Sequence, residues 1–550
     1  MTTVSARVAA VIAAHTDEVF ALMGNGNAHL VDALAREDVR MTAVRHETAT
    51  VASADAYYRV SRRLAVATTT YGPGYTNALT SLAEAAQART PLVLVVGDAP
   101  TTGARPWDID QTAAAAALGA PTITVSAAHA GRSTRDALQR ARDERTAVVL
   151  AIPYDLGAAP AAAEPADDLV LGPRPAPLEA DPIPVERIAA VLAEAERPLI
   201  LAGRGARHSR EALARLADRL GALTISSAPA RGTFAGRPYD LGVSGGFASE
   251  ASAALMAQAD VVLAVGAGLN NFTMSFGDAV SEGTTLAQID VLDAATNPRV
   301  DLFLSADAGE AIRALDAALP DTVTAPETPW GGAAEAARDS RTTFEREPDT
   351  ELADDGLLDP RAVMRALDEI LPEKRQVISD GGHFIGWANS YFRLPAPDAI
   401  TLVGTAFQSI GLGFPSAAGA VRARPDHMAV LVTGDGGGLM GLADLDTLVR
   451  VAESALVLVF NDAGYGAEVH QYGSQGLDER IMRIDRIDFA ALATGFGARS
   501  AVIDRLADLD AVRDWVADGA RGTFVADLRV SDRIVAPYIQ EIIAKTITRA

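Results

Sequence analysis

The chain has 550 residues, of which 49% are apolar, so about three domains with large hydrophobic cores are expected. Acidic residues outnumber basic residues by 71 to 48, and the resulting net charge of −23 argues against nucleic acid and anionic membranes as partners. The absence of cysteine excludes disulfides, thiolate metal sites and cysteine nucleophiles. No apolar run reaches the ~18 residues of a transmembrane helix, and the N-terminus shows no signal-peptide pattern. We therefore expect a soluble cytoplasmic protein.

Strand-like apolar runs alternate with helical patterns in three blocks, residues 1–157, 185–320 and 357–550. Two stretches rich in proline, alanine and acidic residues, 158–184 and 320–355, separate these blocks and are interpreted as linkers. The alternation predicts parallel sheets with helices on both faces, and therefore an α/β fold class with three domains. The strands predicted in the first two blocks are Glu18–Leu22, Leu64–Thr69, Leu92–Val96, Ala147–Ile152, Pro198–Ala202, Leu223–Ser226, Val261–Val265 and Thr285–Ile289.

Two acidic residues follow two predicted strands of the third block. Asp435, between two glycines, follows the apolar run 428–432, and Asp462 follows the apolar run 455–460. Apolar residues at helical spacing over 439–451 predict a helix between these strands. Because open α/β sheets bind ligands at the carboxyl ends of their strands, both carboxylates are expected at a ligand site. Mg²⁺ prefers one or two carboxylates together with phosphate oxygens, and glycine amides at a helix start favour a phosphate.

This arrangement resembles the cofactor motif of the thiamine diphosphate (ThDP) enzymes, in the branch that includes acetolactate synthase, pyruvate oxidase and the 2-keto acid decarboxylases. The resemblance covers nearly the whole chain and implies the domain order pyrimidine-binding, middle and diphosphate-binding. The family usually has asparagine where this chain has Asp462, so metal affinity and its pH dependence are expected to differ. The resemblance implies a Mg²⁺ site made by Asp435, Asp462 and the backbone carbonyl of Gly464. It also implies cofactor contacts from Gly434, Gly436, Gly437 and Tyr465.

Glu47 is the residue that the resemblance identifies as the activating acid. It lies in Arg45-His46-Glu47, near the start of a helical stretch that follows a short strand. In the family, an acid at this point contacts N1′ of the aminopyrimidine. Proton donation to N1′ lets the 4′ nitrogen remove the proton from C2, which is acid–base catalysis relayed through the cofactor.

Three further segments of the first block match the family. The Gly72-Pro73-Gly74 loop follows a predicted strand and opens a helix, and it implies that Pro73 packs beside the cofactor. Gly24 and Asn25 match a segment at which family members carry cofactor and pocket residues. His29 lies on the same segment, and the sequence leaves its role open.

Ile410, in Gln408-Ser409-Ile410-Gly411, matches the large apolar residue that wedges between the two rings of the cofactor in this family. The wedge forces a bent conformation that brings the 4′ nitrogen close to C2, and such oriented approach supplies much of a catalysed rate. The backbone carbonyl of Gln408 and the amide of Ile410 would bind the edge of the aminopyrimidine.

Gln111 and Glu468 point to different branches of the family. Gln111 matches the glutamine that faces the reacting carbon in acetolactate synthases, whereas Glu468 matches a glutamate that lies over the thiazolium in keto acid decarboxylases. With a raised pKa, Glu468 could return a proton after CO₂ has left. His470 follows in the same segment without an assigned role.

The middle block gives the least information. Its glycine turns, Gly203-Arg204-Gly205 and Gly266-Ala267-Gly268, follow strands but lack a full dinucleotide fingerprint. In acetolactate synthase and the oxidases this domain binds FAD; here FAD is an alternative that we do not favour.

The resemblance thus implies a ThDP- and Mg²⁺-dependent lyase or transferase. It would decarboxylate a 2-keto acid without oxidation, join the remaining fragment to an aldehyde or ketone, or do both. The alternatives are an FAD-containing acetolactate synthase, a hydrolase of a cyclic 1,2-diketone, and a catalytically idle ThDP-binding homologue. The family also implies a homodimer or homotetramer with each active site at a subunit interface.

Overall fold

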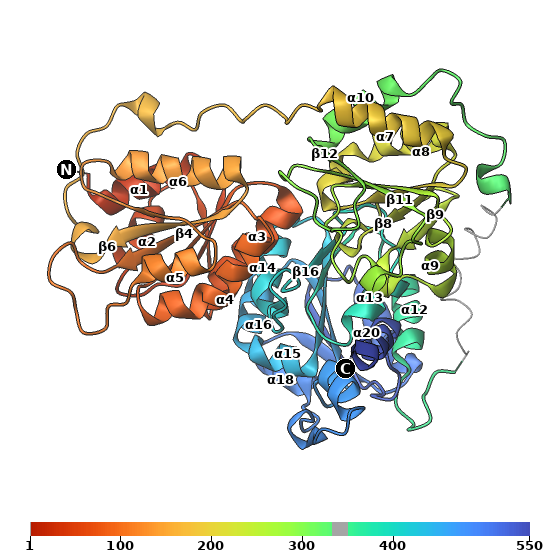
Figure 1. Cartoon of the computed structure of the whole chain (residues 1–550). Helices are drawn as coiled ribbons and strands as arrows, with labels where there is room; N and C mark the ends of the chain where they lie inside the picture. Colours follow the sequence, from red (N-terminus) through yellow and green to blue (C-terminus); the bar gives the residue numbers. More distant parts are fainter. Residues whose placement is uncertain (1, 333–349, 550) are drawn as a thin grey trace.

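The computed structural model describes residues 2–332 and 350–549. Three six-stranded sheets, all with parallel pairing, form the framework, each covered by helices on both faces (Figure 1). This confirms the predicted α/β fold class. The predicted second linker, 320–355, lies partly outside the described residues, since 333–349 are not described. The domain boundaries drawn from sequence stay predictions.

The first sheet has the order β2-β1-β3-β4-β6-β5. Helices α1, α2 and α6 cover one face, and α3, α4 and α5 cover the other. The strands are β1 (Glu18–Ala21), β2 (Arg40–Ala43), β3 (Ala65–Thr69), β4 (Leu92–Asp98), β5 (Thr122–Thr124) and β6 (Ala147–Pro153). The α-helices are α1 (Val4–Ala13), α2 (Ala28–Leu34), α3 (Glu47–Ser61), α4 (Pro73–Gln87), α5 (Gln111–Ala117) and α6 (Ala130–Glu144).

The middle sheet has the order β12-β11-β10-β7-β8-β9. The segment that leads to it from the first domain runs as an extended trace before α7 and contains one short 3₁₀ turn, Ala166–Leu169 (Figure 1). The strands are β7 (Pro198–Ala202), β8 (Leu223–Ser226), β9 (Asp240–Val243), β10 (Val261–Val265), β11 (Thr285–Asp290) and β12 (Leu302–Ser305). The α-helices are α7 (Pro182–Glu194), α8 (Arg210–Leu220), α9 (Glu250–Met256) and α10 (Ala308–Ala318).

The third sheet has the order β14-β13-β15-β16-β18-β17. Its central strand β15 buries Val430 and Val432 on one face and Ala429 and Leu431 on the other, as a parallel sheet covered on both sides requires. The strands are β13 (Arg375–Ser379), β14 (Ile400–Leu402), β15 (Met428–Gly434), β16 (Ser454–Phe460), β17 (Arg499–Ile503) and β18 (Gly522–Leu528). The α-helices are α12 (Pro360–Ile370), α13 (Ile385–Tyr391), α14 (Gly413–Ala423), α15 (Asp435–Met440), α16 (Leu445–Val451), α17 (Gly466–Glu468), α18 (Phe489–Gly495), α19 (Asp510–Ala517) and α20 (Pro537–Arg549).

The single helix predicted over 439–451 is wrong. Helix α15 begins earlier, at Asp435, and ends before Gly441; a 3₁₀ turn, Leu442–Asp444, then leads into α16. A Cβ at Gly441 would lie 2.7 Å from the Pro415 ring. The break therefore lies where α14 passes too close for any larger side chain.

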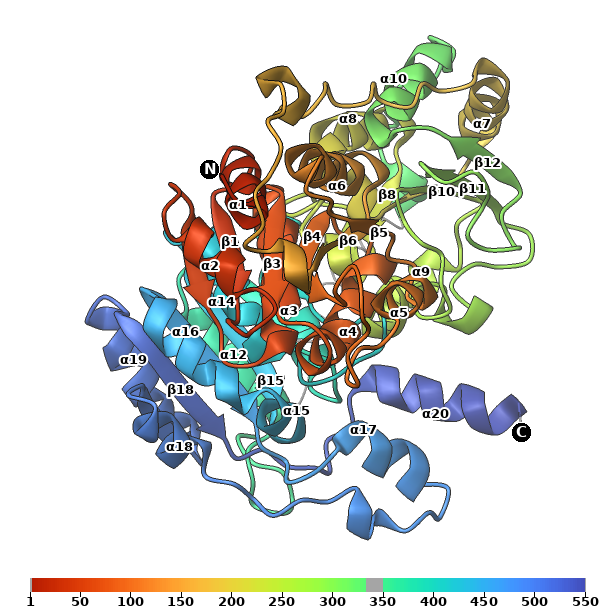
Figure 2. The ribbon, with the colours of Figure 1, turned by 90° about the vertical axis from the view of Figure 1, so that its left-hand side faces the viewer.

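The first and third domains pack against each other through α3 and α14. A Cβ at Gly419 of α14 would lie 1.9 Å from the carbonyl oxygen of Ser53 of α3, so only glycine permits this approach. The Ser53 hydroxyl also donates to the carbonyl of Pro415 at 2.7 Å. Both views show the first domain against the third through these helices (Figures 1 and 2).

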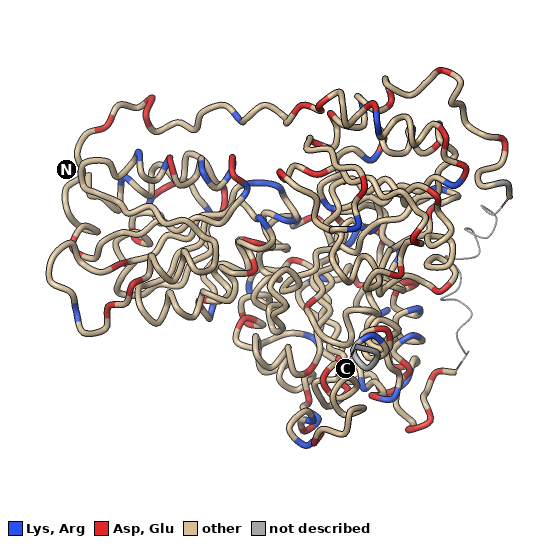
Figure 3. Tube along the Cα trace, in the orientation of Figure 1, with Lys and Arg blue, Asp and Glu red and all other residues tan. Residues whose placement is uncertain are grey.

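Acidic residues are scattered over all three domains (Figure 3). Within the described ranges, no helix is both long enough and apolar enough to cross a bilayer.

Candidate cofactor and active site

Asp435 and Asp462 lie at the carboxyl ends of two neighbouring strands. β15 and β16 pair in parallel with Gly434 opposite Phe460, so the residues that follow share one edge of the sheet. The Asp435 carboxylate is 1% exposed and accepts the amide hydrogens of Gly436 and Ala463, each at 2.8 Å. Ala463 has a left-handed φ of +61°, which turns its loop toward β15.

Only a weak positive influence reaches these two carboxylates in the described residues: Arg486 lowers the pKa of Asp462, but less than burial and Asp532 raise it. Burial and the charge of Asp462 raise the pKa of Asp435 to about 7, and burial and Asp532 raise that of Asp462 to about 7. In the part of the chain that the structure describes, no lysine or arginine forms an ion pair with either residue. A bound divalent cation would supply the missing charge, so the donor set fits Mg²⁺.

Two carboxylates alone are a sparse metal site. The described residues contain no cluster of three or more His, Asp or Glu arranged to hold a metal. Mg²⁺ commonly completes such a set with substrate phosphate oxygens and water. The pair therefore suits a metal that arrives together with a diphosphate.

The glycines beside the acidic pair are packed against aromatic rings. A Cβ at Gly436 would lie 2.6 Å from the Tyr465 ring, and one at Gly434 would lie 2.8 Å from the Phe384 ring. Gly437 faces Asp380, whose carboxylate would lie 3.2 Å from a Cβ there. The predicted cofactor residues of this loop are thus brought together, and larger residues at 434 or 436 would collide with the rings.

His383 is a neighbour of the acidic pair that sequence reasoning missed. It follows β13, is 4% exposed, and its Nδ1 lies 3.8 Å from Oδ2 of Asp462. Its Nε2 accepts the amide hydrogen of Ala536 at 2.8 Å, so the ring proton is on Nδ1, facing Asp462. Burial lowers the His383 pKa to about 4, which keeps the ring neutral.

The segment after the metal loop carries the remaining predicted residues. The Gly464 backbone forms an isolated bridge with Arg483, next to the carboxylate-facing amide of Ala463. Glu468 ends α17 and is exposed. The rings of His470 and His383 lie 4.8 Å apart, and burial, followed by the proximity of His383, lowers the His470 pKa to about 4.

Ile410 and Gln408 lie on the loop between β14 and α14. A Cβ at Gly381 would lie 3.3 Å from Cγ2 of Ile410, so Ile410 projects over the end of β13. Gln408 has a left-handed φ of +64°, and its side-chain amide donates to the carbonyl of Thr405. The loop therefore holds a strained backbone at the residue predicted to bind the aminopyrimidine.

Glu47 is the first residue of α3, after β2, as the sequence predicts. Its Oε2 accepts a hydrogen bond from the Asn77 side chain at 3.0 Å, and its Oε1 would lie 3.4 Å from a Cβ at Gly74. The acid is thus held beside the Gly72-Pro73-Gly74 loop, in which Pro73 opens α4. Within the described residues, the Glu47 carboxylate has no hydrogen bond to the third domain.

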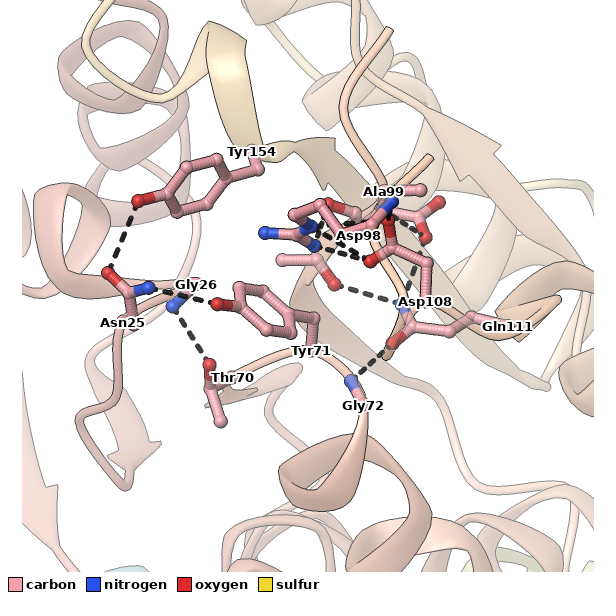
Figure 4. Close-up of polar contacts among 12 residues, drawn as sticks. Asn25, Gly26, Thr70, Tyr71, Gly72, Asp98, Ala99, Asp108, Gln111 and Tyr154 are labelled. Atoms are coloured by element: carbon pink, nitrogen blue, oxygen red, sulfur yellow. Dashed lines mark hydrogen bonds and ion pairs between the residues drawn. The ribbon is translucent and has the colours of Figure 1, made fainter. Parts of the chain in front are cut away.

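Asn25 lies between two tyrosines at the carboxyl edge of the first sheet (Figure 4). Its Nδ2 donates to the Tyr71 hydroxyl at 2.9 Å, and its Oδ1 accepts from the Tyr154 hydroxyl at 3.5 Å. The Gly24 amide donates to Oδ1 of Asn27 at 2.8 Å, a contact that sequence reasoning missed. His29 lies elsewhere, with its ring 3.5 Å from a Cβ placed on Gly157.

The Gln111 side chain is buried and fully engaged (Figure 4). Its Oε1 accepts from the Gly72 amide at 2.8 Å, and its Nε2 donates to the carbonyl of Gly97 at 2.9 Å. In this arrangement Gln111 fixes the turn before Pro73 instead of presenting its amide to a ligand. The predicted role facing the reacting carbon needs these bonds to be exchanged.

Arg105 is stacked on the rings of Tyr71 and Tyr154, the two tyrosines beside Asn25. Its guanidinium carbon lies 4.1 Å from the centre of the Tyr71 ring and 4.7 Å from that of Tyr154. A two-point ion pair with Asp108, at 2.6 Å, already neutralises it. The wall formed by Asn25, Tyr71 and Tyr154 thus offers neutral polar groups.

The glycine turns of the middle domain pack on one another. A Cβ at Gly203 would lie 2.1 Å from the carbonyl oxygen of Gly266, at the point where the strand order changes direction between β7 and β10. Arg204 donates to the carbonyl of Ala88 at the end of α4 at 2.6 Å. These contacts give the turns a structural role, in packing within the middle domain and in contact with the first domain. Binding of FAD stays an alternative that we do not favour.

Comparison with known proteins places this geometry in a family. Three models of thiamine pyrophosphate (that is, ThDP) enzymes match the chain: the N-terminal TPP binding domain at residues 1–118, the central domain at 185–315 and the C-terminal TPP binding domain at 380–526. The chain therefore belongs to the thiamine pyrophosphate enzyme family, which confirms the resemblance seen in the sequence.

Similar proteins include several named enzymes. The chain is 28% identical to a sulfoacetaldehyde acetyltransferase of Castellaniella defragrans, over 100% of this chain and 96% of that protein. It is 30% identical to an acetolactate synthase large subunit of Mycobacterium tuberculosis, over 82% of each chain. It is 27% identical to a pyruvate oxidase of Lactiplantibacillus plantarum, over 90% of this chain and 82% of that protein. The family is thus one of enzymes with transferase, synthase and oxidase members.

Proposed function

We propose that this chain is a ThDP- and Mg²⁺-dependent enzyme. It decarboxylates a 2-keto acid without oxidation. The remaining fragment is then either protonated, which gives an aldehyde, or joined to a carbonyl acceptor. The observation that carries the proposal is the adjacent pair Asp435 and Asp462, each with a pKa raised to about 7, beside glycine amides in the C-terminal TPP binding domain. When bound, ThDP supplies the electron sink that lets the bond to CO₂ break.

The residues of this chain have distinct tasks in that reaction. Asp435, Asp462 and the Gly464 carbonyl would hold Mg²⁺, and the amides near Gly436 would face the diphosphate. Ile410 would keep the two rings of the cofactor close, with Gln408 binding the aminopyrimidine. Glu47 would hold and move a proton at N1′.

The substrate would meet the first domain at the wall of Asn25, Tyr71 and Tyr154. Because Asp108 already neutralises Arg105, this wall favours a neutral carbonyl or hydroxyl over an anionic tail. Glu468, exposed at the end of α17, is available to deliver a proton after CO₂ has left. This supports release of an aldehyde, with joining to a carbonyl acceptor as the competing outcome.

A homodimer or homotetramer is part of the proposal. Apolar side chains near the candidate site are exposed in the single chain, including Met23 at 68%, Trp107 at 56% and Met440 at 57%. Exposed apolar groups of this kind commonly mark an interface. We propose that a second copy covers them and that each site joins the first domain of one subunit to the third domain of another.

An idle homologue is disfavoured by the acidic pair, since a chain without a cation would gain from losing one of these charges. The test is incubation with ThDP, Mg²⁺ and a panel of 2-keto acids and aldehydes, with detection of CO₂, aldehyde and acyloin. Wild type should release CO₂, and Glu47→Gln should slow that release by about 10²- to 10⁴-fold. Equal rates in both proteins would overturn the role of Glu47, and no turnover with any substrate would favour the idle homologue.

A further inference from the structure

A buried ionic network lies directly behind the loop that carries Gln408 and Ile410. Arg59 of α3 donates to Oδ1 of Asp55 at 2.9 Å and to Oε1 of Glu84 of α4 at 2.7 Å. The side chains of Arg59, Asp55 and Glu84 are 8%, 2% and 2% exposed. Burial alone would lower the Arg59 pKa, but the two carboxylates outweigh burial and raise it.

This network reaches across to the third domain through two hydrogen bonds. Nη1 of Arg59 donates to the carbonyl of Leu402 at 2.8 Å, and Oε2 of Glu84 accepts the amide hydrogen of Phe407 at 2.7 Å. Leu402 ends β14, and Phe407 immediately precedes Gln408. Arg59 and Glu84 therefore hold the two ends of the segment 402–407 by hydrogen bonds to its backbone.

The residue that immediately follows this segment, Gln408, has a strained backbone that needs an external restraint. Gln408 has a φ of +64°, a conformation that L residues other than glycine rarely adopt. Gly404, with φ at +78°, turns the chain so that its carbonyl accepts the Ser409 amide hydrogen at 2.9 Å. The Gln408 side chain bonds only within the loop, to Thr405, whereas the adjacent Phe407 amide is bonded to Glu84 of the first domain.

The middle domain supplies a second positive charge to the same network. Burial, followed by repulsion from Arg59, lowers the Arg204 pKa to about 10, and Asp55 and Glu84 oppose this effect. Two arginines thus face two carboxylates in one buried cluster that all three domains share. Such a cluster adds little net stability, because the cost of burying the charges offsets their attraction.

We propose that Glu84, held by Arg59, is a positioning residue for the wedge loop: it sets the backbone of Gln408 and, through it, the place of Ile410. This inference rests on the proposed function, since it assigns Gln408 and Ile410 to the aminopyrimidine. Both carboxylate oxygens of Glu84 are already bonded, one to Arg59 and one to the Phe407 amide, so its effect would pass through the loop backbone.

Glu84→Asp is the variant that separates positioning from folding. It keeps the negative charge beside Arg59 but shortens the side chain by one methylene, which withdraws it from the Phe407 amide. Glu84→Gln, which removes the charge, is the companion variant. Asp368→Asn is the matched control, because Asp368 is 8% exposed and also joins arginine side chains to a backbone amide, that of Arg393 at 3.0 Å.

Two readouts avoid the need for a known substrate. The first is amide hydrogen exchange of the peptide 403–412 in protein without cofactor. The second is the exchange rate of the C2 proton of ThDP bound with Mg²⁺ in D₂O, measured beside ThDP affinity by calorimetry. Glu84→Asp should speed amide exchange in this peptide about tenfold and slow C2 exchange by about 10- to 100-fold, because displacement by about 1 Å costs rates of that order. Asp368→Asn should leave both unchanged, even if it lowers the melting temperature.

The possible results distinguish the positioning role of Glu84 from the proposed ThDP-dependent activity. If wild type exchanges the C2 proton and both Glu84 variants match it, the positioning role is overturned and the proposed function stands. If Asp368→Asn slows C2 exchange as much as Glu84→Asp does, the effect is general destabilisation and the inference also falls. If wild type neither binds ThDP nor exchanges its C2 proton, the proposed function itself is overturned.

Discussion

At the scale of single residues, Asp462 is the most unusual member of the candidate site. It adds a carboxylate beside Asp435, and within the described residues no lysine or arginine forms an ion pair with either, although Arg486 partly offsets the charge of Asp462. Its carboxylate accepts backbone amide hydrogens, including that of Gly464, and Nδ1 of the neutral His383 lies 3.8 Å from its Oδ2. The folded chain without metal therefore bears an electrostatic cost that a divalent cation would remove.

Asp462→Asn is expected to stabilise the metal-free protein and to weaken its binding of Mg²⁺. Burial and Asp532 raise the folded pKa of Asp462 to about 7, above an unfolded value of about 3.9. The carboxyl thus favours folding only while protonated, and metal-free wild type should lose stability as pH rises from about 4 to about 7. The variant should show a flatter pH profile and a higher melting temperature at pH 8, by a few degrees.

Asp446→Asn is the control for this measurement. Asp446 is paired with Arg45 at 2.6 Å and with Arg450 at 2.7 Å, so its loss should lower the melting temperature or leave it unchanged. An Asp462→Asn protein that melts lower than wild type at pH 8 without metal would contradict the account of an uncompensated pair.

Sequence patterns predicted the candidate site residues that lie at a recognisable strand-to-helix junction. Asp435 and Glu47 each follow a strand and begin a helix, and such patterns are visible without tertiary structure. His383 and Glu84 escaped notice because their roles depend on partners far along the chain, Ala536 and Phe407. Nothing in the sequence around either residue indicates those contacts.

At the scale of elements, the packing of α3 on α14 determines how Glu47 lies relative to the third domain. Glu47 is the first residue of α3, and Arg45, two residues earlier, donates its amide hydrogen to Oδ1 of Asp444 at 2.8 Å. The close approach of Gly419 to Ser53 sets the separation of the two helices. The helix contact and the position of Glu47 are therefore linked.

Gly419→Ala should force α3 and α14 apart and lower the free energy of unfolding by about 1–3 kcal/mol. The comparison is Gly495→Ala at the end of α18, where a Cβ would meet nothing within 4 Å and the change should be neutral or slightly stabilising. Urea denaturation of both variants measures the difference. Equal midpoints would show that the helix contact can relax at no cost.

The bounds of several strands were predicted more accurately than the bounds of the helix over 439–451. Buried parallel strands such as β7 and β10 are short apolar runs whose ends coincide with loss of apolar residues. The break at Gly441 could not be predicted, because it depends on the approach of Pro415 from α14. Tertiary contact overrode the helical spacing of 439–451.

At the scale of the whole molecule, the proposed active site is built by two copies of the chain. Within one chain, Glu47 bonds to Asn77 of its own domain, and the exposed apolar groups surround the site edges. A site shared between subunits can be tested by mixing two inactive variants, Glu47→Gln and Asp435→Asn. Co-folded mixtures should regain about a quarter of wild-type sites, because half of the dimers are mixed and each mixed dimer has one intact site.

The C2 proton exchange of bound ThDP measures this complementation without a known substrate. Each variant alone is the baseline, and two Glu47→Gln preparations mixed together are the control. Mixtures that stay at the baseline, while sedimentation shows mixed dimers, would place Glu47 and Asp435 of the same chain in one site.

The most direct test of the central claim is calorimetric titration of ThDP into the protein at saturating Mg²⁺. Wild type should bind one ThDP per chain saturably, and this binding should be lost on chelation of the metal and lost in Asp435→Ala. Absence of binding by wild type, or equal binding by Asp435→Ala with and without Mg²⁺, would contradict it.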